Sequence, residues 1–219
     1  MIIAVDGPTA SGKGTIAKAL AAHYGLPHLD TGLLYRAVGV TCIARGGDPD
    51  IESDALAATN FPDDLLVDPS LKSEAAGGLA SRVSRWPAVR AALLRQQRDF
   101  ADQPGGAVLD GRDIGTVIAP HADAKLFVTA SVEARAARRH AEMVERGEDV
   151  TVADITADLR RRDERDANRE AAPLTRAKDA ALLDTGDLSI ERAVEQAIAL
   201  VDAQVERSVQ DRRRGEQAG

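Results

Sequence analysis

Several features that would point to other classes of protein are missing from this sequence of 219 residues. A single cysteine excludes a disulfide within the chain. No apolar run approaches the roughly 18 residues that a membrane-spanning helix needs. No charged-then-apolar leader precedes Ile2, because strand-like residues begin almost at once. We therefore expect a cytoplasmic protein that is neither targeted elsewhere nor bound to a membrane.

Aromatic rings and positive charge are also scarce. Three Phe, two Tyr and one Trp offer few surfaces for stacking on single-stranded bases, and the net charge is −7. Both observations argue against a nucleic-acid partner. Lysine is rare too, with five residues against 23 arginines. Planar guanidinium groups grip phosphate oxygens in pairs, although a compositional bias towards arginine would produce the same count.

What the sequence does contain is a glycine-rich segment, GPTASGKGT, between a strand-like run at residues 2–6 and a helix-like run at residues 16–22. Glycines in such a loop let backbone N–H groups turn inward around an anion, at the positive end of a helix. Lys13 can then reach the β- and γ-phosphates of a nucleotide. Gly14 stands where most such loops carry a hydroxyl, which comes one residue later, at Thr15. We predict that ATP is bound by Gly7, Pro8, Thr9, Ala10, Ser11, Gly12, Lys13, Gly14 and Thr15.

Strand-like and helix-like segments alternate along the chain. The expected strands are residues 2–6, 27–30, 107–110, 124–129 and 181–184. The expected helices are about 13–24, 32–44, 52–58, 73–85, 88–101, 132–146, 152–168 and 190–207. This order predicts an α/β fold with a doubly wound, five-stranded parallel sheet and helices on both faces. We expect the tail, residues 208–219, to be frayed, with a basic docking tail as the alternative.

Polar residues gather where the expected strands end, and these ends bind the ligands of doubly wound sheets. After the second strand, Thr31 is followed one turn later by Arg36, which can return toward the cleft, although a simple helix cap explains the same residues. After the third strand, Asp110 stands where P-loop enzymes place the acidic residue that orients magnesium. Arg112 can hold a phosphate and Asp113 can accept from a base amino group, with a solvated turn as the alternative.

One expected helix carries a row of charges. Arg162, Arg165, Asp166 and Arg169 are spaced by three, four and seven residues, which places them on one helical face. An exposed helix with internal ion pairs would look similar. In phosphoryl transfer, however, the charge on the transferring group must be met by cations, and arginines on a mobile helix can arrive only when substrates are bound.

Five segments occur in order over most of the chain: GPTASGKGT, DTG-x-x-YR at 30–36, SRVSRWPAVR at 81–90, DGRDIGT at 110–116 and RDERDANR at 162–169. Together they resemble the bacterial cytidylate kinases, a family of nucleoside monophosphate kinases with a P-loop. The resemblance implies transfer of the ATP γ-phosphoryl group to CMP or dCMP, giving ADP and CDP or dCDP, with Mg²⁺ as cofactor. Another small-molecule P-loop kinase and a nucleotide-dependent switch remain the alternatives.

The resemblance also implies roles for individual residues. Cytosine would be contacted by Ser81, Arg90 and Asp113; the CMP ribose and phosphate by Thr31, Arg36 and Arg112; and the acceptor side and lid would include Arg162, Asp166 and Arg169. Cytosine chemistry agrees, because its N4 amino group suits an aspartate while N3 and O2 accept from Arg and Ser. The expected catalytic cations are Lys13, Arg112, Arg162 and Arg169, and the expected metal residues are Thr15 and Asp110, the latter through water.

The expected organisation is a single P-loop kinase domain over residues 1–219, with an acceptor-binding insert at about 31–102 and a lid at about 147–170. We expect a monomer. Two positions depart from the family pattern. Thr31 replaces the usual Ser and keeps its hydroxyl, and the stretch between Phe61 and Lys72 is shorter than in many members, with Lys72 in place of Arg.

Overall fold

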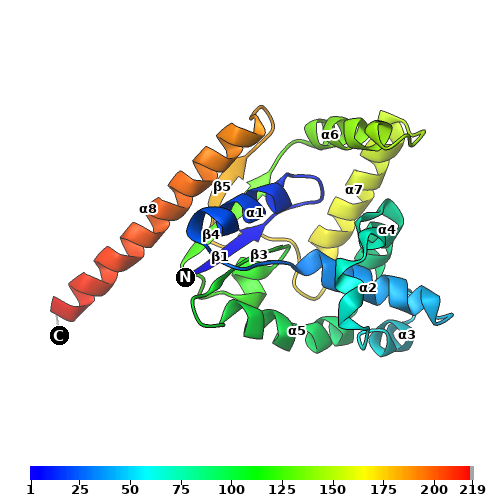
Figure 1. Ribbon diagram of the computed structural model, residues 1–219, viewed down its shortest axis with the longest axis horizontal. Coiled ribbons are helices and arrows are strands. Elements are labelled where there is room, and N and C mark those ends of the chain that lie inside the picture. The colour runs from blue at the N-terminus through cyan, green and yellow to red at the C-terminus, as the bar shows by residue number, and fades with distance from the viewer. Residues whose placement is uncertain (218–219) are drawn as a thin grey trace.

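The computed structural model describes residues 1–217, and for residues 209 and 211–217 it describes the backbone only. Its strands are β1 (Ile2–Asp6), β2 (His28–Asp30), β3 (Ala107–Gly111), β4 (Ala124–Thr129) and β5 (Ala181–Asp184). They form one parallel sheet in the order β2-β3-β1-β4-β5 (Figure 1). The predicted doubly wound, five-stranded parallel sheet is confirmed.

The main helices are α1 (Lys13–Tyr24), α2 (Thr31–Ala44), α3 (Glu52–Ala57), α4 (Glu74–Val83), α5 (Pro87–Ala101), α6 (Val132–Glu145), α7 (Val152–Asn168) and α8 (Ile190–Gln217). Three short turns of helix were not predicted: the 3₁₀ helices η1 (Asp63–Val67) and η2 (Pro69–Lys72), and the π-helix η3 (Ile114–Ile118). Such single turns carry no hydrophobic periodicity that a sequence pattern could reveal.

Both faces of the sheet are covered, which explains why its strands read as continuous apolar runs. Successive side chains of a strand point to opposite faces. Ile3 and Val5 of β1 therefore pack in one buried cluster with residues of α1 and α8. Ala4, between them, packs in a second cluster with residues of α5 and η3. The phosphate-loop end of β1 is thus fixed by packing on both sides.

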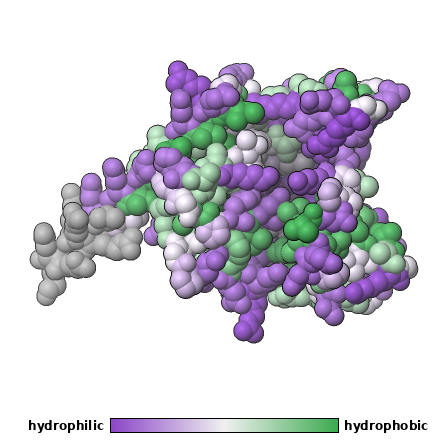
Figure 2. Space-filling model, viewed as in Figure 1, coloured by the Kyte–Doolittle hydropathy of each residue, from purple (hydrophilic) through white to green (hydrophobic). Residues whose placement is uncertain are grey.

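Two smaller cores lie away from the sheet. One joins α2, α3, α4 and α5 around Leu34, Val38 and Leu93, and the other joins α6 and α7 around Met143 and Leu159. In Figure 1, α7 lies between α6 and α4, and it contacts both. Hydrophilic residues cover much of the face in Figure 2, while apolar residues gather over the region of α2 to α5.

The last helix differs from its prediction. α8 does not end near residue 207 but continues to Gln217, and its end projects beyond the sheet in Figure 1. The backbone of residues 208–217 is helical here, while fraying of this tail stays a prediction, and residues 218 and 219 lie outside the described chain. No proline or glycine interrupts the sequence from Ile190 to Arg214, so nothing local stops the helix. No helix among the described residues could span a membrane.

Candidate active site

The loop between β1 and α1 has the geometry of a phosphate-binding loop. Gly12, at the N-cap of α1, has a left-handed φ of 84°, which glycine adopts without strain. Gly7 is needed for a different reason, since a Cβ there would lie 2.0 Å from the carbonyl oxygen of Val128. The loop therefore presents backbone N–H groups at the positive end of α1, as an anion site requires.

Lys13 begins α1 and borders a cavity lined by residues of the phosphate loop, the strand ends and α7. Its ammonium group has no hydrogen-bond partner among the described residues. Burial lowers its pKa to about 8, with a further lowering by Arg112, although Asp110 and Asp30 act in the opposite direction. A half-buried cation without a direct partner is stabilised when an anion joins it, so Lys13 is suited to hold a phosphate.

The carboxyl groups of Asp30 and Asp110 stand at the ends of two paired strands. His28 Nε2 lies 2.7 Å from Asp110 Oδ1, while Asp110 Oδ2 faces Gly14, 3.8 Å from the position of a Cβ there. Burial raises the pKa of Asp30, and the neighbouring Asp110 raises it further. Two neighbouring carboxyl groups of this kind fit a divalent cation, which oxygen ligands bind.

Thr15, the other residue expected at the metal, is not brought to this place. Its side chain is exposed, and it does not line the cavity that Gly14 and Lys13 line. Consecutive residues of an α-helix differ in direction by about 100°, so a hydroxyl one position later points away from the one it replaces. The structure therefore does not bring Thr15 and Asp110 together.

Opposite the loop, the cavity ends at a buried cluster around Asp113. One guanidinium nitrogen of Arg90 donates to Asp113 Oδ2, and Arg169 Nη2 lies 3.8 Å from Asp113 Oδ1. The guanidinium carbon of Arg90 lies over the Tyr35 ring, 5.5 Å from the ring centre. The Ser81 hydroxyl is buried and has no hydrogen-bond partner among the described residues. These groups form a buried pattern of donors and acceptors that a planar polar ligand can complete.

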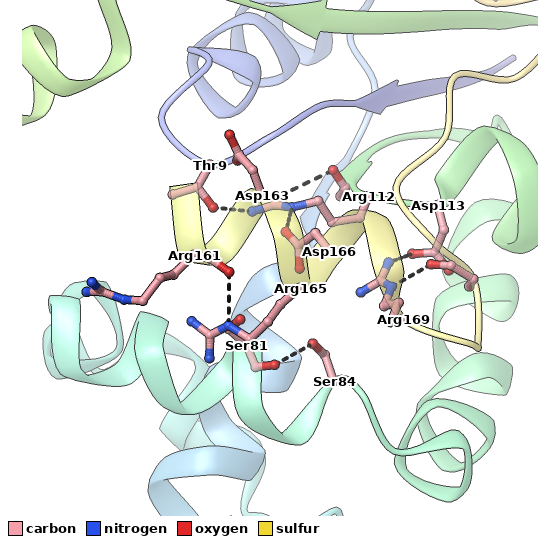
Figure 3. A network of polar contacts seen from close by, with 12 residues as sticks. Thr9, Ser81, Ser84, Arg112, Asp113, Arg161, Asp163, Arg165, Asp166 and Arg169 are labelled. Carbon is pink, nitrogen blue, oxygen red and sulfur yellow. Dashed lines mark hydrogen bonds and ion pairs between the residues drawn. The ribbon is translucent and has the colours of Figure 1, made fainter. Parts of the chain in front are cut away.

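Arg112 joins the phosphate loop to α7. Its Nε donates to Asp166 Oδ2 at 2.8 Å, and its Nη2 donates to the Thr9 hydroxyl at 2.6 Å (Figure 3). Burial raises the pKa of Asp166, but the facing guanidinium of Arg112 outweighs it and leaves that pKa below its ordinary value. The pair is therefore ionised, and it positions Arg112 between the two ends of the cavity.

Two residues expected to bind the acceptor nucleotide donate hydrogen bonds to backbone carbonyl oxygens. The Thr31 hydroxyl donates to the carbonyl oxygen of Asp110 at 2.9 Å. Arg36 Nη1 donates to the carbonyl oxygens of Leu71 and Ser73, at 2.6 and 2.9 Å. Both side chains still line the cavity, and Arg36 keeps its other nitrogens for a ligand.

The sequence reasoning missed two further residues, which pair with each other beside the cavity. Glu74 of α4 accepts from Arg162 of α7 at 3.2 Å and also pairs with Arg139 of α6. Arg139 lines the cavity beside Arg36 and Arg162. Its only sequence signal is a double arginine on a charged helix, which an exposed helix would show equally.

The cavity thus brings together most of the expected residues. Those on its wall are Thr9, Ala10, Lys13, Gly14, Thr31, Arg36, Ser81, Arg90, Asp110, Arg112, Asp113, Arg162, Asp166 and Arg169. The remaining expected residues, which belong to the phosphate loop but do not line the wall, are Gly7, Pro8, Ser11, Gly12 and Thr15. An anion loop at one end and a buried polar cluster at the other define a P-loop kinase with a second ligand facing the nucleotide.

Comparison with known proteins identifies the family. Residues 3–203 match the family model described as cytidylate kinase. A protein named cytidylate kinase from Xanthobacter autotrophicus is 58% identical over 204 residues, which cover 93% of this chain and 98% of that protein. One of the same name from Caulobacter sp. is 54% identical over 205 residues, 92% of this chain and 94% of its own. The chain belongs to the cytidylate kinase family, which confirms the resemblance.

The fold is found in solved structures of low sequence similarity. A crystal structure of an uncharacterized protein from Eubacterium ventriosum has a TM-score of 0.55 at 15% identity, covering 92% of this chain and 98% of its own. At that identity the likeness concerns the fold alone.

Proposed function

We propose that this chain transfers the γ-phosphoryl group of ATP to CMP or dCMP, forming ADP and CDP or dCDP. One observation carries the proposal: a single cavity runs from the phosphate loop to the buried Asp113 cluster. Asp113 can accept from the cytosine N4 amino group, while Arg90 and Ser81 can donate to N3 and O2. Uracil would present O4, an acceptor, to the Asp113 carboxylate, and two acceptors cannot form a hydrogen bond.

The reaction needs no general base from the protein. A nucleotide 5′-phosphate has a second pKa near 6, so its oxygen is already largely anionic at pH 7 and can attack as it stands. The protein must instead align the two nucleotides and neutralise charge on the transferring group. Lys13 is placed for the donor phosphates, and Arg112, Arg162 and Arg169 line the wall of the cavity between donor and acceptor.

We further propose Mg²⁺ as the cofactor, held near Asp110 with Asp30 beside it. The carboxylate oxygens at the ends of β2 and β3 fit such an ion. When bound, the ion would neutralise part of the charge on the ATP phosphates. Removing divalent ions with a chelator should abolish turnover, and added Mg²⁺ should restore it.

The organisation of the chain is proposed in the same terms. The insert of about residues 31–102 contains the core of α2 to α5 and would hold the acceptor, and the lid of about residues 147–170 contains α7. We propose that the protein acts as a cytoplasmic monomer.

The proposal is tested by measuring ADP formation with ATP and each of CMP, dCMP, UMP, AMP and a shikimate-like alcohol. We expect ADP to form only when ATP and an acceptor are both present, with CMP or dCMP the preferred acceptor. A strong preference for a non-cytidine acceptor would identify a different P-loop kinase. Tight nucleotide binding without turnover would identify a switch.

A further inference from the structure

Asp6 is a buried carboxyl group that the proposed reaction does not use. It is the last residue of β1, directly before Gly7 of the phosphate loop, and only 4% of its surface is exposed. Buried carboxyl groups are rare in proteins unless each oxygen is satisfied. Both oxygens of Asp6 therefore need hydrogen-bond partners at the junction of the sheet and the phosphate loop.

Each oxygen of Asp6 accepts a hydrogen bond from the backbone of another segment. The N–H of Ile114 donates to Oδ1 and the N–H of Gly115 donates to Oδ2, both at 2.8 Å. These two amides begin η3, where a helix leaves its first N–H groups without internal partners. The carboxylate of β1 therefore supplies the partners that η3 lacks.

The segment held in this way directly follows the residues expected to contact the acceptor. Asp113 immediately precedes the two held amides, and Arg112 precedes Asp113. Asp113 is the N-cap of η3, with φ −145° and ψ 25°. Its carboxylate accepts a hydrogen bond from Arg90. A shift of the Ile114 and Gly115 backbone would change where the Asp113 carboxylate points.

Packing leaves little freedom at this contact. A Cβ on Gly115 would lie 3.1 Å from Lys125 Cδ and 3.4 Å from Asp6 Oδ2. A Cβ at residue 115 would therefore crowd the buried side chain of Lys125 of β4, while it would touch Asp6 at an ordinary contact distance. A side chain at residue 115 would disturb the packing beside the Asp6 contact.

We propose that Asp6 is a positioning residue for acceptor recognition: its carboxylate clamps the backbone of Ile114 and Gly115, and so fixes Asp113 relative to the phosphate loop. The same residue ends the strand that leads into the donor loop and holds the segment that reads the acceptor base. One side chain thus sets the distance between the two halves of the site. The inference rests on the proposed function only for the identity of the acceptor.

Burial outweighs the groups that stabilise the charge of Asp6. Burial raises its pKa to about 6, while the Gly115 and Ile114 amides lower it; of the charged groups that face it, Asp113 raises it and Arg112 lowers it. The aliphatic part of Lys125 lies across Gly115, and its ammonium group is engaged with Asp179 at 2.7 Å. The clamp is complete while Asp6 is ionised, and protonation replaces one acceptor by a donor.

The test compares Asp6→Asn with Asp123→Asn. A carboxamide has one acceptor oxygen and an NH₂ group that cannot accept, so Asp6→Asn keeps at most one of the two bonds. Asp123 is the matched control, because its carboxylate accepts the N–H of Ile2 at 2.9 Å, at the opposite end of the same strand. The Asn oxygen can still accept the hydrogen bond from the Ile2 N–H.

We expect Asp6→Asn to lower kcat/KM for CMP about tenfold or more, the effect of losing one charged hydrogen bond. The KM for ATP should change by less than about twofold, and the preference for CMP over UMP should fall. Asp123→Asn should leave all three unchanged. Equal losses toward ATP and CMP, or an unchanged CMP to UMP ratio in Asp6→Asn, would overturn the proposal.

A spectroscopic measurement tests the clamp without activity. In the wild-type protein, the backbone amide NMR signals of Ile114 and Gly115 should move together with one midpoint near pH 6. Gly115→Ala, which crowds Lys125 beside the Asp6 contact, should shift the Asp113 amide signal and raise the KM for CMP. If Asp6→Asn does not fold, the amide titration and the Gly115→Ala variant test the proposal instead. Absence of a shared titration of the Ile114 and Gly115 amides would overturn the clamp. A wild-type protein that shows the titration but does not phosphorylate CMP would refute only the proposed function.

Discussion

At the scale of single residues, the site is built from charges that neutralise one another within the protein. Arg112 faces Asp166, and Arg90 faces Asp113. Both partners of each pair are largely withdrawn from water, so removing one leaves the other buried and unpaired, which costs about 3–5 kcal/mol. Substitutions here will affect stability as well as activity, and tests must separate the two.

Lys13→Ala should lower kcat by about 10²- to 10³-fold, the usual effect of removing one electrostatic contact to a transition state. Steady-state kinetics measures this, and Lys18→Ala is the matched control because it removes an exposed lysine from the same helix. Turnover of Lys13→Ala equal to that of the control would remove the phosphate loop from the proposed mechanism.

Asp113→Asn should reverse part of the base preference. The Asn side chain can donate to the O4 of uracil, so kcat/KM for CMP should fall about 5- to 150-fold, which corresponds to about 1–3 kcal/mol, while relative use of UMP rises. Competition assays with the two nucleotides measure the ratio. Asp99→Asn, at an exposed residue of α5, should not change it. An unchanged CMP to UMP ratio in Asp113→Asn would mean that Asp113 does not contact the base.

At the scale of elements, the acceptor insert depends on a close contact between α2 and α4. A Cβ on Gly39 of α2 would lie 2.6 Å from Leu79 Cβ, a distance that real Cβ atoms do not show. The two helices can approach this closely only because residue 39 has no side chain. Since α4 also carries Ser81, the contact places part of the acceptor wall.

We therefore expect Gly39→Ala to destabilise the protein by about 1–3 kcal/mol, the usual cost of overpacking. Gly78→Ala is the control: it lies in α4 with nothing within 4 Å of its Cβ position, and it should stabilise by about 0.5–1 kcal/mol through helix propensity. Chemical denaturation measures both. Equal effects of the two substitutions would mean that the helices separate without cost.

At the scale of the whole molecule, Glu74 ties the arm formed by α6 and α7 to the acceptor insert. Glu74 forms ion pairs with Arg162 of α7 and with Arg139 of α6, and both arginines line the cavity. The arm has its own small core, against which Ala10 of the phosphate loop packs. We expect the arm to move as a unit and the Glu74 bridge to restrain it.

Glu74→Ala should release the arm in the absence of nucleotides. Limited digestion with trypsin should then cut faster at Arg146, which ends α6 at the turn before α7. Glu133→Ala removes an exposed pair with Arg160, within the arm itself, and should not change the rate. If Glu74→Ala is cut no faster than this control, the bridge does not hold the arm.

Long patterned segments and the strand ends could be predicted from the sequence, because strand and helix periods and glycine-rich turns are local signals. Arg139, Glu74 and Asp6 could not, because their roles depend on contacts between segments far apart in the chain. Glu74 and Arg139 meet only when α4 faces α6. Thr15 was expected in the cavity on spacing, but the direction of a side chain depends on the phase of its helix.

The sequence by itself determined the parallel sheet, the phosphate loop and the family, since these follow from short-range periodicity and from motifs in fixed order. Only the tertiary structure decided how the strand ends meet: which carboxylate faces which guanidinium, that Asp6 reaches across to the segment after Asp113, and that Glu74 joins the arm to the insert. The physical reason is that hydrogen bonds and ion pairs act over a few ångströms in space, whatever the separation along the chain.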